Sequence, residues 1–122
     1  MESKQILIVD DSPEVNQMMC WMLEDAGYEV HSAESAEDGL QKAEEIENLP
    51  LLLMDIVLPK MSGQEAIEIL RKNPKFNSTV IIAVTAETDP DELSHILHLG
   101  ANDILTKPVN EESLIKTVRH YL

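Results

Sequence analysis

The sequence has little cysteine, few basic residues and no long apolar run, and each of these absences excludes a class of protein. The single cysteine, Cys20, cannot form an internal disulfide, which predicts a cytoplasmic protein. No apolar run approaches the ~20 residues needed to cross a bilayer, so no membrane span is expected. Nine lysine and arginine residues stand against 23 acidic residues, a net charge of −14. Such a surface repels phosphate backbones, which argues against direct nucleic-acid binding.

The acidic residues are unevenly distributed along the chain. Residues 1–50 hold 13 acidic residues against Lys4 and Lys42, a net charge of −11, and the other 72 residues hold 10 against 7 basic ones, a net charge of −3. Most of them are expected to form a solvated surface, and the few that follow apolar strands are candidate cation ligands. The length suits one domain, and no linker or low-complexity segment divides it, so residues 1–122 are predicted to form a single domain.

Short apolar runs alternate with amphipathic segments over the whole chain. Strands are predicted at residues 5–10, 28–33, 51–55, 79–85 and 102–107. Helices are predicted at residues 14–26, 35–48, 63–73, 89–100 and 110–122. This alternation predicts an α/β fold of five βα units, with a doubly wound parallel sheet covered by helices on both faces. In such sheets, ligands bind outside the carboxyl ends of the strands.

Polar residues gather where the apolar strands end. Asp10 and Asp11 follow the first strand, Asp55 ends the third, Thr85 ends the fourth and Lys107 ends the fifth. Clustered carboxylates repel each other and need a cation or protons, and oxygen ligands suit Mg²⁺. Asp55 has the chemistry of a nucleophile that forms an acyl phosphate, while Lys107 and Thr85 suit the oxygens of a phosphoryl group. Each acid alone is readily explained as a helix cap, but five such positions on one edge favour a site.

Four motifs stand in order along the chain. They are VDDS at 9–12, D-x-x-x-P-x-x-x-G from Asp55 through Pro59 to Gly63, VTA at 84–86 and TKP at 106–108. Together they resemble the response-regulator receiver domains, the phosphoacceptor half of two-component signalling, over essentially the whole chain. The resemblance implies the flavodoxin-like strand order 2-1-3-4-5. It also implies a regulatory phosphoacceptor rather than an enzyme with a separate substrate.

The same resemblance implies roles for the charged residues. Asp55 would accept a phosphoryl group from a histidine of a sensor histidine kinase or of a histidine phosphotransfer domain. Asp11 and Asp55 would bind Mg²⁺ directly with the backbone carbonyl of Val57, and Asp10 would act mainly through a coordinated water. Lys107 would pair with Asp55 and then with the phosphoryl oxygens.

Further roles follow from the remaining motif positions. Thr85 and the backbone N–H of Ala86 would hold another phosphoryl oxygen. The peptide bond before Pro108 would be cis, and Pro59 and Gly63 would shape the loop after the phosphoacceptor. Slow autodephosphorylation is expected.

The first helix offers a surface for the phosphodonor. Met18 and Trp21 fall towards the flank of the predicted helix rather than into the core, and Val15 lies beside them. Receiver domains resembling this one meet their donors with this helix and with the loop after the fifth strand, here at Pro108. We therefore expect a donor-docking patch at Val15, Met18 and Pro108.

The sequence departs from the family at Ile104, where receiver domains usually carry Tyr or Phe three residues before the strand-five lysine. A downstream protein is expected to bind the face of helix 89–100, strand 102–107 and helix 110–122. With Ile104, an aromatic side chain cannot turn inward to switch that face. A smaller shift of Thr85 and its loop is the coupling that remains.

Two other functions fit parts of the pattern. A flavodoxin-like electron carrier would share the fold, but its phosphate-binding loop needs glycine and hydroxyl groups where this chain has DDSPE. A receiver-like module that binds partners without phosphorylation is the second alternative. The pair His95 and His98 has no cysteine and no third histidine nearby in the sequence and is expected to lie on the surface. The chain is either a stand-alone regulator or a piece of a larger protein such as a hybrid kinase.

Overall fold

A computed structural model describes residues 4–122, so the first three residues of the domain predicted for 1–122 lie outside the described part. The strands are β1 (Gln5–Val9), β2 (Glu29–Ala33), β3 (Leu51–Asp55), β4 (Val80–Thr85) and β5 (Asp103–Thr106). The α-helices are α1 (Pro13–Asp25), α2 (Ala36–Glu45), α3 (Gly63–Lys72), α4 (Pro90–Leu99) and α5 (Glu111–Tyr121). A short 3₁₀ helix, η1 (Pro74–Phe76), follows α3.

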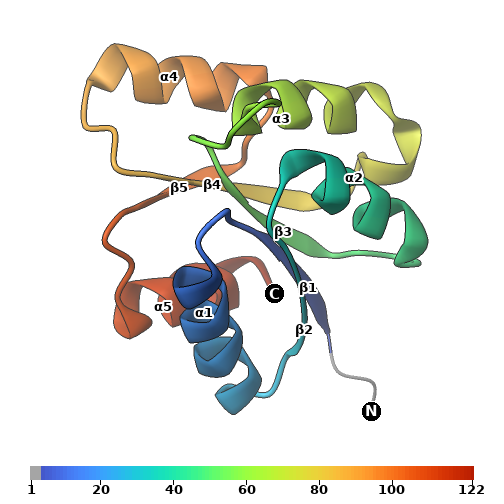
Figure 1. Cartoon of the computed structure of the whole chain (residues 1–122), viewed down its shortest axis with the longest axis vertical. Helices are drawn as coiled ribbons and strands as arrows, with labels where there is room; N and C mark the ends of the chain where they lie inside the picture. The colour runs from blue at the N-terminus through green and yellow to red at the C-terminus, as the bar shows by residue number, and fades with distance from the viewer. Residues whose placement is uncertain (1–3) are drawn as a thin grey trace.

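The five strands form one parallel sheet in the order β2-β1-β3-β4-β5, which confirms the predicted fold and strand order. Figure 1 shows α1 and α5 on one side of this sheet and α2, α3 and α4 on the other. Because the strand order reverses between β1 and β3, the loops after these two strands diverge to opposite faces. A ligand site is expected at this point.

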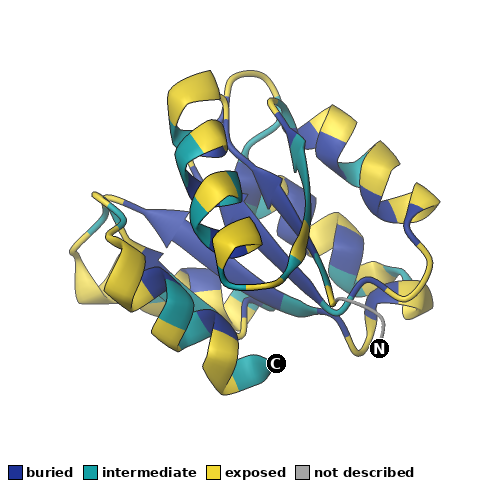
Figure 2. Ribbon diagram, turned by 90° about the horizontal axis from the view of Figure 1, so that it is seen from below, coloured by how far each residue is buried: buried dark blue, intermediate teal, exposed yellow. Residues whose placement is uncertain are grey.

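Two hydrophobic cores lie on the two faces of the sheet, because side chains alternate along each strand. Leu7, Val9, Leu52 and Met54 point to the core under α2, α3 and α4. Ile6, Ile8, Leu51 and Leu53 point to the core under α1 and α5. In Figure 2 the central strands β1, β3 and β4 are almost wholly buried, the edge strands β2 and β5 are only partly buried, and each helix shows an exposed outer surface. This double burial explains the uninterrupted apolar runs of β1, β3 and β4.

Most predicted elements agree with the structure to within one residue at each end, but the helix predicted at 35–48 is shorter. It ends at Glu45 because Ile46 adopts extended backbone angles (φ −88°, ψ 118°). Asn48 then takes a positive φ of 56°, and both Ile46 and Leu49 are buried. The chain thus leaves the helix early so that it can turn two apolar side chains into the core.

The 3₁₀ helix η1 was not predicted from the sequence. The side chain of Asn73 accepts a hydrogen bond from the backbone N–H of Lys75, and the ring of Phe76 is buried.

The sequence predicts that no segment spans a membrane, and the lengths and hydropathy of the helices bear on this prediction. Within residues 4–122, no helix is both long enough and apolar enough to cross a membrane.

Arg71, near the end of α3, joins several segments at the amino-terminal edge of the sheet. Its Nε donates to the carbonyl of Gly100 (2.8 Å) and its Nη1 to the carbonyl of Phe76 (2.7 Å). Its Nη2 donates to the carbonyl of Thr79 (2.9 Å) and to Oδ1 of Asn102 (2.7 Å). One guanidinium therefore holds η1 and the starts of β4 and β5 against α3, at the edge opposite the predicted site.

Candidate functional site

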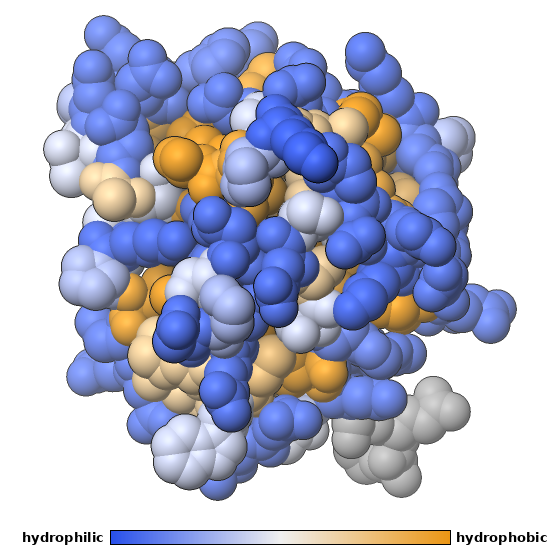
Figure 3. Space-filling view, in the orientation of Figure 1, coloured by the Kyte–Doolittle hydropathy of each residue, from blue (hydrophilic) through white to orange (hydrophobic). Residues whose placement is uncertain are grey.

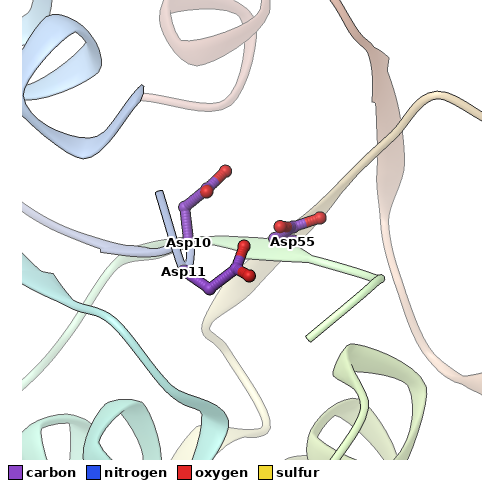
Figure 4. Close-up of side chains that lie close together, drawn as sticks. All are labelled: Asp10, Asp11 and Asp55. Atoms are coloured by element: carbon purple, nitrogen blue, oxygen red, sulfur yellow. The ribbon is translucent and has the colours of Figure 1, made fainter. Parts of the chain in front are cut away.

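Three carboxylates come together at the carboxyl ends of β1 and β3. Asp10 and Asp11 follow β1, Asp55 ends β3, and each offers one oxygen within 4.8 Å of the other two (Figure 4). Asp10 and Asp55 are 1% and 3% exposed, whereas Asp11 is exposed. Hard carboxylate oxygens in this number fit Mg²⁺, which takes one or two protein carboxylates and several waters. Within residues 4–122, three or more potential metal ligands gather only in this cluster.

Lys107, just after β5, lies between the two buried carboxylates. Its Nζ is 3.0 Å from Oδ2 of Asp10 and 3.2 Å from Oδ2 of Asp55. Burial would lower the pKa of Lys107, but the hydrogen bonds and charges of the two aspartates outweigh burial and raise it. Lys107 therefore stays an ammonium ion, and the pairing predicted with Asp55 is present together with a pairing to Asp10 that was not predicted.

The ionised form of Asp55 remains disfavoured although Lys107 lies beside it. Its pKa is raised, first by burial and then by the negative charge of Asp10. Lys107 and a hydrogen bond from the backbone N–H of Val57 act in the opposite direction and do not compensate. One ammonium shared by two buried carboxylates is too little positive charge, so the site favours an additional cation.

Asp10 is held at both of its carboxylate oxygens. Oδ1 accepts the backbone N–H of Ser12 at 2.9 Å, and Oδ2 faces Lys107. The side chain of Ser12 also accepts a hydrogen bond from the N–H of Val15 and so caps α1. The predicted indirect role of Asp10 is compatible with this geometry, because neither of its oxygens is left without a partner.

Thr85 lies at the end of β4, one residue beyond the partner of Asp55 in the sheet register. Its side chain is buried, and its Oγ1 accepts the backbone N–H of Glu87 at 3.0 Å. Its carbonyl accepts the backbone N–H of Lys107 at 2.8 Å, which ties the ends of β4 and β5 together. Ala86 follows and is exposed. The Thr85 oxygen thus accepts a hydrogen bond from its own loop, and its O–H can still donate to a phosphoryl oxygen.

The loop after Asp55 is shaped by close contact with Gly63, where α3 begins. The N–H of Gly63 donates to the carbonyl of Ile56 at 2.9 Å. A Cβ atom at residue 63 would lie 2.1 Å from the carbonyl oxygen of Asp55, so only glycine fits. Pro59 is exposed, and Val57 is 76% exposed. Beside this loop lies a groove of about 340 Å³ that Val57, Thr85 and Glu87 help to line, whereas Asp55 itself is buried and does not line it.

The residues of the predicted docking patch lie on α1 and after β5. Val15 and Met18 are half-buried, and Trp21 is 73% exposed. Pro108 is exposed and its peptide bond with Lys107 is cis, as the resemblance implies. Figure 3 shows that hydrophilic residues cover most of the face in view and that smaller hydrophobic areas lie between them.

Ile104 is half-buried against the core that lies under α3 and α4, where Leu93 and Leu99 also pack. In the sheet it pairs with Ala83 of β4. The outer face of α4 carries His95 and His98, both exposed, as the sequence predicts. Position 104 thus already holds an aliphatic side chain packed inward.

Sequence reasoning missed Asn16, which is buried near the start of α1. Its side chain contacts the main chain at the end of β1. The spacing of Asn16, Met19 and Leu23 places all three on the buried face of the helix, and an amide at such a position was a signal in the sequence.

Comparison with known proteins shows the family. A model described as the response regulator receiver domain matches residues 6–119. The chain is 39% identical over 118 residues to protein PilH of Pseudomonas aeruginosa, with 97% of each chain covered. It is 32% identical to the CAI-1 autoinducer sensor kinase/phosphatase CqsS of Vibrio cholerae over 94% of this chain and 17% of that protein. The structure of the chemotaxis response regulator CheY4 of Vibrio cholerae matches with a TM-score of 0.93 at 34% identity, covering 99% of this chain and 100% of that one.

These matches decide against the flavodoxin-like electron carrier, which shares the strand order alone. Receiver domains are regulatory rather than enzymes in the usual sense, interact with histidine kinases and generally bind Mg²⁺ at an acidic pocket. The motifs, the strand order and the acidic cluster at the switch point are consistent with this description. The chain belongs to the response regulator receiver domain family of two-component signalling.

Proposed function

We propose that this chain is a phosphoacceptor that receives a phosphoryl group on Asp55 from a phosphohistidine of its partner. The observation that carries the proposal is the position of Lys107, whose Nζ pairs with both Asp10 and Asp55 at the open end of the sheet. Asp55 is held at the end of a buried central strand, and the exposed Asp11 lies beside it. A rigid carboxylate beside a fixed ammonium suits attack on a phosphoryl group.

In the proposed reaction, a carboxylate oxygen of Asp55 attacks the phosphorus atom of phosphohistidine. The phosphorus–nitrogen bond breaks, its electron pair stays on the imidazole nitrogen, and Asp55 becomes an acyl phosphate. Lys107 pairs with the phosphoryl oxygens, and the Thr85 hydroxyl and the Ala86 N–H donate to another of them. Slow attack by water later returns the carboxylate and inorganic phosphate.

Mg²⁺ is part of the same proposal. Asp11, Asp55 and the backbone carbonyl of Val57 would hold it directly, and Asp10 would do so through a coordinated water. When bound, Mg²⁺ supplies positive charge beside the phosphoryl oxygens and lowers the repulsion among the carboxylates. The raised pKa of Asp55 supports this proposal, because it indicates that the carboxylates have too little positive charge around them.

The proposed donor is a sensor histidine kinase or a histidine phosphotransfer domain that docks on Val15, Met18 and Pro108. This surface has apolar side chains beside the acidic pocket, and the exposed Trp21 extends it along α1. Val15→Ala and Met18→Ala are expected to slow phosphotransfer from the cognate donor. Ile69→Ala is the matched control, since Ile69 is an exposed apolar residue (45%) on α3, which covers the other face of the sheet. Equal transfer rates in all three variants would contradict the docking proposal.

The proposed output surface is formed by α4, β5 and α5. A shift of Thr85 towards the phosphoryl group would move the loop before α4, because the backbone N–H of Glu87 in that loop is hydrogen-bonded to Thr85. Ile104 is already packed inward and contributes no aromatic switch. The cytoplasmic location and the single-domain organisation predicted from the sequence remain predictions alongside this one.

Mass spectrometry after incubation with Mg²⁺ and acetyl phosphate or phosphoramidate tests the proposal. The expected result is a gain of one phosphoryl group that is absent in Asp55→Asn and when EDTA replaces Mg²⁺. No gain under any condition would instead support the second alternative, a module that binds partners without being phosphorylated.

A further inference from the structure

Asn16 is a buried amide on α1 that reaches the main chain of two neighbouring strands. The residue is 5% exposed, and its Nδ2 donates to the carbonyl of Asp10 at 2.7 Å and to the carbonyl of Ala33 at 3.1 Å. Its own Oδ1 is buried and has no hydrogen-bond partner among residues 4–122. A buried acceptor without a partner is unfavourable, so the contribution of this amide must come from its two donated hydrogen bonds.

These two hydrogen bonds fix the turn that carries the acidic ligands. The carbonyl of Asp10 belongs to the peptide unit that leads into Asp11, so Asn16 sets the orientation of that unit. The backbone N–H of Asp10 also donates to the carbonyl of Ala33 at 3.1 Å, which anchors the turn to the end of β2. Among residues 4–122, the Asp11 carboxylate makes no hydrogen bond that would orient it independently.

We infer that Asn16 is a positioning residue for the cation site: it clamps the Asp10–Asp11 peptide to the end of β2 and so directs both carboxylates into the pocket. The inference rests on the proposed binding of Mg²⁺ by these carboxylates. Hydrogen-bonding partners behind metal ligands typically change metal affinity by about 10–100-fold when they are removed. Without the clamp, the exposed Asp11 samples orientations that do not face Asp55.

Thr79 provides a matched control at the opposite edge of the sheet. It is also 5% exposed, and its Oγ1 donates to the carbonyl of Leu49 at 2.7 Å. Thr79→Val removes one buried hydrogen bond from a side chain to a main-chain carbonyl, and Asn16→Ala removes two. Both variants therefore lose the same kind of interaction, but only Asn16→Ala loses it beside the carboxylates.

The experiment is titration of the full chain with Mg²⁺ alone by isothermal calorimetry, after circular dichroism has established that each variant is folded. Asn16→Ala is expected to raise the Mg²⁺ dissociation constant by about 10–100-fold, whereas Thr79→Val leaves it unchanged. Asn16→Ser retains one hydroxyl donor and is expected to lie between Asn16→Ala and the wild type. It also supplies the measurement if Asn16→Ala does not fold.

Each outcome has a definite meaning. Unchanged affinity in a folded Asn16 variant, with or without a loss of stability, would overturn the inference and leave the proposed function standing. Equal weakening in Thr79→Val would overturn it too, because the effect would then be a general consequence of lost stability. A wild-type chain that does not bind Mg²⁺ would refute the cation site of the proposed function and the inference with it.

Discussion

Replacing Asp55 by asparagine is expected to stabilise the cation-free fold at neutral pH. Burial and the charge of Asp10 raise the pKa of Asp55. A carboxyl group whose pKa is higher in the folded than in the unfolded state stabilises the fold below its unfolded pKa. That contribution is lost as the pH rises through the folded pKa. At neutral pH the ionised side chain therefore lowers the free energy of unfolding, and a neutral amide of the same shape removes this penalty.

The distances give the size of the effect. The Nζ of Lys107 is 3.2 Å from Asp55, which corresponds to an attraction of about 5 kcal/mol at an effective dielectric constant of about 20. The Asp10 carboxylate lies within 4.8 Å, and its repulsion offsets about 3.5 kcal/mol of that attraction. The remainder is smaller than the several kcal/mol needed to remove a carboxylate from water. We expect Asp55→Asn to raise the free energy of unfolding by about 1–3 kcal/mol.

Urea denaturation in EDTA and in Mg²⁺ measures this difference. If Mg²⁺ binds as proposed, a concentration about 100-fold above its dissociation constant would add about 2.7 kcal/mol to the free energy of unfolding of the wild type and less to that of the asparagine variant, which lacks a proposed ligand. The advantage of the variant should therefore shrink or reverse. Asp25→Asn removes one charge from an exposed position, and a change of under about 0.5 kcal/mol would show that net charge is not the cause. A variant less stable than the wild type in EDTA would refute the reasoning.

Three further predictions concern neighbouring features. Lys107→Met leaves two buried carboxylates without their ammonium partner and should lower the free energy of unfolding by about 3–5 kcal/mol. Calorimetry should show that this loss grows as the pH rises from acidic to neutral. Gly63→Ala forces the backbone of Asp55 to move and should lower the free energy of unfolding by about 1–3 kcal/mol while slowing phosphorylation by acetyl phosphate. A lysine at position 71 cannot reproduce the four hydrogen bonds of the guanidinium. Arg71→Lys should therefore lower the free energy of unfolding, measured by urea denaturation, by about 2–4 kcal/mol and leave the Mg²⁺ affinity unchanged.

The fold was predictable because the strands are buried on both faces. Continuous apolar runs such as residues 51–54 leave few alternatives to a parallel sheet, and the acids at their ends must then meet at one edge. The end of α2 was not predictable in the same way. Glu44 and Glu45 continue a helical pattern, and the helix ends only because Ile46 and Leu49 have places in the core.

The sequence was enough to predict that the charged residues meet at one edge of the sheet, but not which of them form ion pairs. Which carboxylate Lys107 contacts depends on side-chain positions around the switch point, and the structure shows contacts with two. The clamp by Asn16 joins α1 to the ends of β1 and β2 and needs their three-dimensional arrangement. Ile104 was visible as a departure from the family pattern, yet its packing against the core under α3 and α4 is a property of the fold.

The exposed position of Trp21 has a practical consequence for spectroscopy. It is the single tryptophan of the chain, it is 73% exposed, and it lies on the proposed donor-docking helix rather than in the acidic pocket. Its fluorescence emission should therefore change little when Mg²⁺ binds or when Asp55 is phosphorylated. A partner that covers α1 would transfer the indole out of water and shift its emission to shorter wavelength. The fluorescence of Trp21 can thus report binding of the donor separately from the phosphotransfer that follows.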